Sequence, residues 1–242
     1  MPMWLLIALV IEGMALVGAL GVLATKRTRS AFLAGFNTML PVTAIYVWYS
    51  GPLSGREIVV LALVAGYLLR MNWILVAWQD QTAVSKIDAR TPASQKYFLP
   101  FLLANTVGWG YCLPFYFAVR RTDPLGWIDA VALAIYVVGT VVHFGSDYQK
   151  RRFKRRPDAA GRILDTGFWS ASRHPNYFGD FLIYVSFAVV SASIWGWVSP
   201  LLNLLQYMFD AIPKSERWAA ERYGPAWEAY KARTKAFVPY LI

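Results

Sequence analysis

The chain has 242 residues, 57% of them hydrophobic and 16% charged, with a mean hydropathy of +0.39 and a formal net charge of +10. A soluble domain of this size has too little interior for so much apolar surface, so this composition indicates an integral membrane protein. With two histidines and one cysteine, Cys112, the chain offers no metal cluster and no intramolecular disulfide.

Six apolar segments are long enough to cross a bilayer, which takes about 20 residues. A seventh is shorter, and the first has no basic region before it and no cleavage site, so we interpret it as a retained span and not as a signal peptide. Prolines in or beside several segments predict kinks. In chain order the seven segments are residues 3–24, 31–49, 58–78, 97–119, 125–146, 177–198 and 200–212.

The basic residues alternate between the two sides of these segments. The stretches after the first, third, fifth and seventh hold 20 of the 24 Lys and Arg residues, including Lys86 and Arg90 after the third. By the positive-inside rule, the chain is an all-α polytopic membrane protein with seven transmembrane helices, its N-terminus outside and its C-terminus cytoplasmic. The net charge therefore reflects topology, and we expect no nucleic-acid partner.

The organisation is that of one unit, because the chain shows no internal repeat, linker or change of composition. We expect a single transmembrane helical domain over residues 1–242. The cytoplasmic loop 148–175 and the tail 213–242 would cap a cofactor pocket at the ends of the helices.

Polar residues at membrane depth are costly and so are candidates for function. Tyr67 and Arg70 are three residues apart in the third segment, which places them on one helical face. Arg70 also fits a structural ion pair or a side chain that reaches the interface. Further polar residues that interhelical hydrogen bonds would equally explain are Glu12, Asn37, Thr38, Asn105 and Tyr111.

A second group of polar residues brackets the longest basic stretch. His143 and Asp147 close the fifth segment, and Asn176, Tyr177 and Asp180 open the sixth at the same face. Basic side chains suit phosphates, and the acceptors suit ribose hydroxyls or an amide, which together predict a nucleotide cofactor site. The basic stretch alone would equally suit anionic lipid headgroups. Neither a Rossmann fingerprint nor a P-loop is present.

Two stretches carry a family resemblance. "HFGSDYQKRRFKRRPDAAGRILDTGFWSASRHPNYFGDF" and the terminal "RYGPAWEAYKARTKAFVPYLI" resemble the membrane-embedded steroid 5-alpha-reductase family, the 3-oxo-5-alpha-steroid 4-dehydrogenases, in its bacterial branch. The resemblance covers residues 142–242 and extends loosely to the first four spans. Sterol reductases share a related R-H-P-x-Y-x-G motif, as do the isoprenylcysteine carboxyl methyltransferases, which use S-adenosylmethionine.

The resemblance implies roles for individual residues. It implies that Tyr67 donates a hydrogen bond to the substrate carbonyl, with Arg70 beside it and Asn37 as a further catalytic candidate. The steroid enzymes carry a glutamate in the second span, whereas "FNTMLPV" here has no acid, which leaves the substrate open. For NADPH, the candidate residues are His143, Asp147, Lys154, Arg162, Arg173, His174, Asn176, Tyr177, Asp180 and Tyr223.

The implied activity is NADPH-dependent reduction of a conjugated carbon–carbon double bond in a 3-oxo-4-ene steroid or a similar lipid enone. The hydrophobic substrate would enter from the bilayer, and we expect a monomer in the bacterial inner membrane. One alternative is a methyltransferase that uses S-adenosylmethionine on a lipid or prenylated thiol. Another is a membrane scaffold or lipid-binding protein without catalysis.

Overall fold

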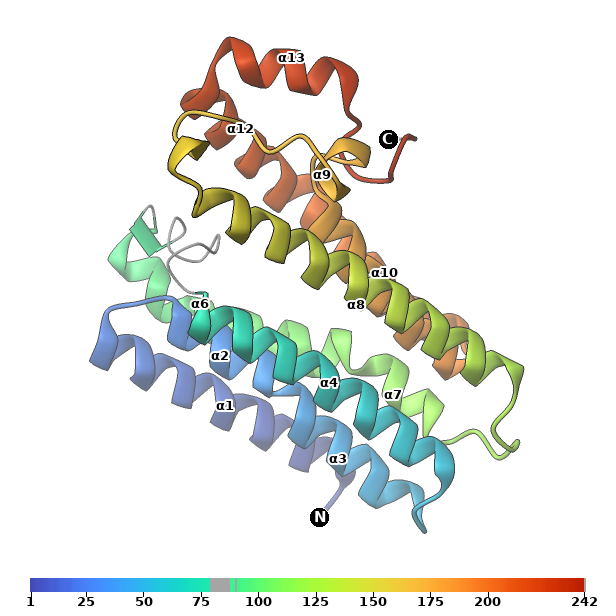
Figure 1. The fold of residues 1–242 in the computed structure, drawn as a ribbon. Coiled ribbons are helices and arrows are strands. Elements are labelled where there is room, and N and C mark those ends of the chain that lie inside the picture. The colour runs from blue at the N-terminus through green and yellow to red at the C-terminus, as the bar shows by residue number, and fades with distance from the viewer. Residues whose placement is uncertain (79–87, 90, 242) are drawn as a thin grey trace. The chain divides into compact units, whose positions relative to one another are not determined.

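All regular structure in the described part of the chain is helical (Figure 1). The structure is a computed structural model, and it describes residues 1–78, 88–89 and 91–241. Lys86 and Arg90, two of the basic residues on which the predicted topology depends, lie outside the described residues. The chain forms two compact units, Met1–Ile128 with Ala188–Ser199 (unit 1) and Asp129–Phe187 with Pro200–Ile242 (unit 2).

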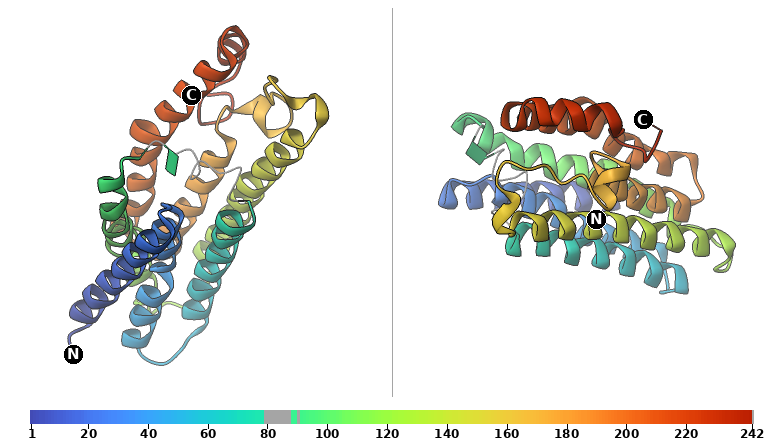
Figure 2. Two further views of the ribbon diagram at one scale, coloured as in Figure 1. Left: turned by 90° about the vertical axis from the view of Figure 1, so that its left-hand side faces the viewer. Right: turned by 45° about the horizontal axis from the view of Figure 1, so that its top comes forward.

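Unit 1 contains the first four predicted spans. Its first helix, α1, packs against α2 and α6 (Figure 2). A short 3₁₀-helix, η4, comes from the later part of the chain. The elements are α1 (Met3–Thr25), α2 (Arg29–Asn37), α3 (Met39–Ser50), α4 (Gly55–Ala77), α6 (Ala93–Asn105), the π-helical η2 (Thr106–Tyr111), α7 (Leu113–Ala118) and η4 (Ile194–Trp197).

Two irregularities in unit 1 have a local cause in proline. Pro41 has no N–H to donate to the carbonyl of Asn37, and the helix is interrupted at Thr38, between α2 and α3. Pro114 likewise cannot donate to Gly110, and the turn before it is the π-helix η2. At these two prolines the α-helical pattern is interrupted, whereas Pro100 lies inside the continuous helix α6.

Unit 2 is built around two long helices, α8 and α10. Several of its elements follow one another with little or no intervening loop. They are α8 (Trp127–Lys154), the 3₁₀-helix η3 (Pro157–Ala159), α9 (Phe168–Ala171), α10 (Pro175–Ser191), α11 (Val198–Gln206), the π-helical η5 (Tyr207–Ala211), α12 (Ile212–Tyr223) and α13 (Pro225–Arg233). The start of α8, the end of α10 and the start of α11 fall within the residue ranges of unit 1.

The predicted spans are matched in part. Among the described residues, five segments are long and apolar enough to cross a membrane: Met3–Thr25, Arg29–Ser50, Gly55–Ala77, Ser94–Ala118 and Trp127–Lys154. The integral membrane, all-helical class is thereby confirmed for the described residues. The count of seven spans and the orientation of the termini remain predictions.

Three predicted boundaries differ from the structure. The loop expected from residue 148 is still helical as far as Lys154, because the basic residues of the last turn of α8 complement the helix dipole. The sixth span, expected to reach residue 198, ends at Ser191, and Ala192 adopts a positive φ of 49°. The segment expected at 200–212 begins at Val198 and continues as helix through η5 into α12.

Helices α8 and α10 lie side by side along a seam where two glycines meet (Figure 1). A Cβ atom added at Gly139 would lie 2.7 Å from the carbonyl oxygen of Gly179, and one at Gly179 would overlap the backbone of His143. Only glycine permits so close an approach of the two backbones. The seam therefore brings the polar ends of the two helices into direct contact.

Candidate functional site

Four polar side chains meet on the seam between α8 and α10, and we call them the seam cluster: His143, Asp147, Asn176 and Asp180. The ring of His143 lies between two carboxylates, with Nδ1 3.1 Å from Asp180 Oδ1 and Nε2 3.4 Å from Asp147 Oδ2. Asn176 Nδ2 donates to Asp147 Oδ1 at 3.2 Å. The structure thus brings together four residues that the sequence predicts as cofactor ligands.

Asp180 is the buried end of this cluster. Its second oxygen, Oδ2, accepts a hydrogen bond from the Tyr207 hydroxyl at 2.7 Å and a longer one, 3.4 Å, from Asn203 Nδ2. Sequence reasoning did not single out Tyr207 or Asn203. The two residues are four apart in an apolar segment. Their shared helical face and their polarity at membrane depth are the features of the sequence that could have identified them.

A row of three stacked rings lies beside the cluster. The rings of His174 and Tyr177 are 5.3 Å apart and nearly parallel, at 4°. Tyr177 stacks in turn on Tyr207, at 4.6 Å and 10°. Because Tyr207 also bonds Asp180, the stack connects the start of α10 to the polar cluster.

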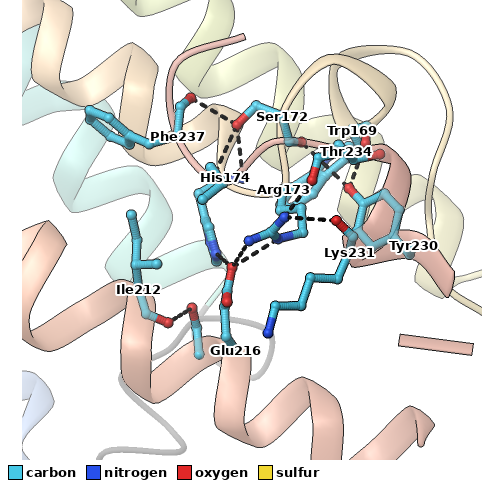
Figure 3. Close-up of polar contacts among 12 residues, drawn as sticks. Trp169, Ser172, Arg173, His174, Ile212, Glu216, Tyr230, Lys231, Thr234 and Phe237 are labelled. Atoms are coloured by element: carbon cyan, nitrogen blue, oxygen red, sulfur yellow. Dashed lines mark hydrogen bonds and ion pairs between the residues drawn. The ribbon is translucent and has the colours of Figure 1, made fainter. Parts of the chain in front are cut away.

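Arg173 and His174, predicted as cofactor ligands, are buried and contact the C-terminal tail (Figure 3). Arg173 Nη2 lies 2.7 Å from Glu216 Oε1, and His174 Nε2 lies 3.3 Å from the same oxygen. The Arg173 guanidinium also donates to the carbonyl oxygens of Lys231 and Thr234. We call Arg173, His174 and Glu216 the tail anchor; sequence reasoning did not single out Glu216.

Hydrogen bonds from neighbouring residues extend the anchor along the tail. Ser172 Oγ donates to the carbonyl oxygen of Phe237 at 2.9 Å, and the backbone N–H of Arg173 donates to that of Lys235 at 2.8 Å. The hydroxyl of Tyr230 donates to the carbonyl oxygen of Trp169. The segment before α10 is therefore held to the tail at several points.

The electrostatics of the anchor follow from burial and pairing. Burial alone would raise the pKa of Glu216, but hydrogen bonds from His174 and Arg173 outweigh it and lower the pKa to about 2. Burial lowers the pKa of His174, and Glu216 offsets this only in part. Near neutral pH the anchor is thus an ion pair of Arg173 and Glu216 with an uncharged His174 as a further donor.

The basic residues that the sequence predicts for phosphates lie on exposed surface. Lys154 ends α8, and Arg162 follows η3, where it pairs with Asp158. Lys150, one turn before Lys154, has its ammonium group 4.6 Å from the centre of the Trp169 ring. Tyr223, half-buried, ends α12. Lys154 lies on α8, as His143 and Asp147 do, whereas Arg162 and Tyr223 come from other elements of unit 2.

The three predicted catalytic residues lie in unit 1. Tyr67 is buried, and its ring centre is 5.0 Å from the guanidinium carbon of Arg70, so the two share a face of α4 as predicted. Asn37 and Asn72 exchange two hydrogen bonds between their amides, at 2.8 and 3.0 Å. For Asn37, the structure therefore shows the interhelical hydrogen bond that was the alternative to a catalytic role.

Comparison with known proteins adds a family and named relatives. Residues 24–234 match a family described as "Protein of unknown function (DUF1295)". Delta(14)-sterol reductase TM7SF2 of Mus musculus is 30% identical over 188 residues, which cover 68% of this chain and 42% of the relative. The 3-oxo-5-alpha-steroid 4-dehydrogenase 1 of Mus musculus is 27% identical over 130 residues, 52% of this chain and 48% of the relative.

A bacterial relative matches a shorter part of the chain. The Delta(14)-sterol reductase of Methylotuvimicrobium alcaliphilum is 25% identical over 150 residues, 54% of this chain and 34% of the relative. The matched region therefore spans less than half the length of each of these three relatives.

Proposed function

The chain belongs to the DUF1295 family, which includes steroid 5-alpha-reductase-like proteins, and on this premise we propose that it is an NADPH-dependent reductase of a conjugated carbon–carbon double bond in a steroid-like lipid. The relatives described above are named as reductases and a dehydrogenase. The methyltransferase alternative finds no support in these comparisons.

The observation that carries the proposal is the seam cluster together with the basic end of the same helix. Asp147 and Asn176 hold a carboxylate and a carboxamide side by side, and the Asp147 side chain is 18% exposed. One to two turns further along α8, basic residues from Lys150 to Lys154 follow. Carboxylate and amide suit ribose hydroxyls and the nicotinamide carboxamide, while lysine and arginine suit phosphates, so this donor set fits NADPH.

When bound, NADPH would supply a hydride to the double bond. The residues of the chain would hold the cofactor and orient one another. In this proposal Asp147 and Asn176 contact the cofactor. His143, which is held by its contact with the buried Asp180, orients the Asp147 carboxylate. Lys154, Arg162 and Tyr223 remain proposed contacts to the rest of the cofactor.

The tail anchor has a different part in the proposal. Because Arg173 and His174 contact Glu216, we assign them a structural role. They hold the segment that leads into α10 to the C-terminal tail, while Asn176 is placed by its own contact with Asp147 on α8. Tyr177, stacked between His174 and Tyr207, stiffens the same turn.

Tyr67 is the residue that we propose to contact the substrate. Its hydroxyl would donate to the substrate carbonyl and stabilise the enolate that forms as the double bond is reduced, an effect of about 3 kcal/mol for one such donor in a dry site. Arg70, beside the Tyr67 ring, would favour the developing negative charge through its own positive charge. The enolate then takes a proton to complete the reduction.

A ligand panel tests the cofactor. In detergent, NADPH should raise the unfolding temperature of the protein, because a ligand that binds only the folded state stabilises it by mass action. NADH should raise it less, since it lacks the 2′-phosphate that the basic surface would recognise. Stabilisation by S-adenosylmethionine without any effect of NADPH would contradict the proposal.

Turnover by Tyr67→Phe tests the substrate end. The variant keeps the buried ring but loses the donor, so NADPH binding should persist while turnover of a 3-oxo-4-ene steroid falls about 100-fold. Turnover is followed by the loss of NADPH absorbance, with the product identified by mass. Wild-type turnover in the variant would remove Tyr67 from the mechanism, and no enone reduction by the wild type would argue against the substrate class.

A further inference from the structure

One side of α8 carries a continuous row of exposed apolar side chains. The seam with α10 uses another side of this helix, where Gly139, His143 and Asp147 follow one another at intervals of four residues (Figure 1). Away from the seam, large apolar residues recur every three or four positions and therefore share a face. We call this row the outer stripe: Leu133, Val137, Val141, Phe144 and Tyr148.

The exposed aromatic residues of α8 are spaced to match a bilayer. Trp127 is the first residue of the helix and Tyr148 is the last of the outer stripe, and both are exposed. Within one continuous helix they are about 32 Å apart, at a rise of about 1.5 Å per residue. The hydrocarbon core of a bilayer is about 30 Å thick, and Trp and Tyr gather at its two boundaries. Tyr148 therefore marks the level at which lipid headgroups begin.

Two arginines follow the outer stripe at this level. Arg152 is exposed and lies one turn after Tyr148 on the same face, about 6 Å further along the helix. Arg155 is also exposed, in a turn closed by a hydrogen bond from its backbone N–H to the carbonyl oxygen of Arg152. Neither guanidinium forms an ion pair within the described part of the chain, whereas the adjacent Arg156 pairs with Asp158. Arg152 and Arg155 can therefore bind an external anion.

The lysines of the same helix end lie on the seam side. Lys150 and Lys154 are three and seven residues after Asp147, so they continue the side of α8 that carries this carboxylate. The ammonium group of Lys150 contacts the Trp169 ring. The basic end of α8 is thus divided by helical geometry: its lysines continue the seam side, and Arg152 continues the outer stripe.

We propose that Arg152 and Arg155 bind the phosphate group of an anionic phospholipid whose acyl chains lie along the outer stripe. A guanidinium group matches the geometry of phosphate oxygens, and the apolar residues of the stripe meet the acyl chains at the depth of the hydrocarbon core. An anionic headgroup fits better than a zwitterionic one, because it brings no ammonium group that the arginines would repel. The inference does not depend on the proposed reductase function, and it leaves the lysines of the seam side for a cofactor.

Lipid binding to the whole chain in detergent tests the proposal. Native mass spectrometry measures the affinity for phosphatidylglycerol, which is anionic, against that for phosphatidylcholine, which is zwitterionic. The wild type should prefer phosphatidylglycerol. In the double variant Arg152→Gln, Arg155→Gln this preference should fall about 30-fold, since each basic residue near an anionic surface contributes about fivefold. An unchanged preference would overturn the proposal, and weaker NADPH binding alongside it would assign the two arginines to the cofactor instead.

A single charge removed from either side of the helix tests the division by face. Arg152→Gln should lower the preference for phosphatidylglycerol about fivefold, whereas the matched control Lys154→Gln should lower it less than about twofold. Both side chains are exposed, so the unfolding temperature in detergent should stay that of the wild type. Equal losses of preference would mean that the whole basic segment attracts lipid without a site on the outer stripe, which would also overturn the proposal.

Discussion

Residues 172–174 and 176–180 are separated by one proline, yet they contact different parts of unit 2. Ser172, Arg173 and His174 bond the C-terminal tail, whereas Asn176 and Asp180 bond α8. The backbone explains the division. Ser172 is extended, with φ −149° and ψ 150°, and α10 begins at Pro175, a residue that suits the first turn of a helix.

In the helical half, residues four apart share a face, so Asn176 and Asp180 both reach α8 and Gly179 lies at the contact. In the extended half, consecutive side chains are free to reach the tail. Polar residues that are neighbours in sequence thus divide into a structural anchor and a candidate ligand site. If this division is right, each half can be broken while the property that depends on the other is retained.

Glu216→Ala should have the largest effect of these variants, and that effect is a loss of folding stability. It leaves the buried Arg173 guanidinium without its carboxylate, which costs about 3 kcal/mol for a buried pair that loses one partner. The measurement is thermal unfolding together with limited proteolysis of the tail. Asp210→Ala, which removes an exposed ion pair with Lys214, is the matched control and should cost under about 1 kcal/mol.

NADPH affinity of the Glu216→Ala protein, measured where it is still folded, should fall less than about tenfold, since the seam cluster is retained. If Glu216→Ala were as stable as the Asp210→Ala control, the tail anchor would not contribute to stability as proposed.

Asp147→Ala should show the opposite pattern. It removes a proposed ligand that is partly exposed, so NADPH affinity should fall by about 100-fold, equivalent to about 2.7 kcal/mol, while the unliganded protein stays folded. Titration of the unfolding temperature with NADPH measures both quantities on one sample. Asp210→Ala is again the control, and wild-type affinity in Asp147→Ala would show that the seam cluster does not bind the cofactor.

Much of the fold is predictable from hydropathy, because each of the first five spans is a long apolar run. The later boundaries are not. The turn at Ala192 includes a close contact between Gly196 and Ser191, and hydropathy does not register such local packing. The extension of α8 to Lys154 is missed for another reason. Basic residues predict that a segment lies outside the membrane, but they do not predict whether that segment is helical.

The candidate site is predictable to a similar extent. Asp147 and Asn176 are expected at the same face because each lies where a predicted span meets the same predicted loop, and the structure places them in contact. The partner of Arg173 is not predictable in this way. Glu216 lies far along the chain, and nothing in a single sequence indicates which of the 14 acidic residues a buried arginine will bind.

Gly179→Ala should perturb the seam by an intermediate amount. The added methyl group would overlap the backbone of His143, and such overpacking costs about 2 kcal/mol. Both the unfolding temperature and NADPH affinity should fall, because α10 must shift away from α8. Gly126→Ala, where the nearest atom is 3.9 Å away, is the control for adding a methyl group. A variant as stable as this control would mean that the helices tolerate separation without loss.

The smallest effect is a pH dependence of stability to which the anchor should contribute. The pKa of Glu216 is lowered from 4.5 to about 2 in the folded protein, so the unfolded chain binds its proton first as the pH falls below about 4.5. The pKa of His174 is lowered from 6.5, so the unfolded chain also binds this proton first, starting at a higher pH. Both groups therefore contribute stability that is complete above their unfolded-state pKa values and is lost on acidification.

Glu216→Gln, which keeps the side-chain volume, should lower the unfolding temperature at neutral pH. It should also flatten the decline of the unfolding temperature between about pH 4.5 and about pH 2, whereas Asn176→Ala should keep the wild-type decline. An equal decline in wild type and Glu216→Gln would show that the anchor carboxyl does not titrate with folding, and a flattened decline in Asn176→Ala would show that the two halves of the motif are coupled.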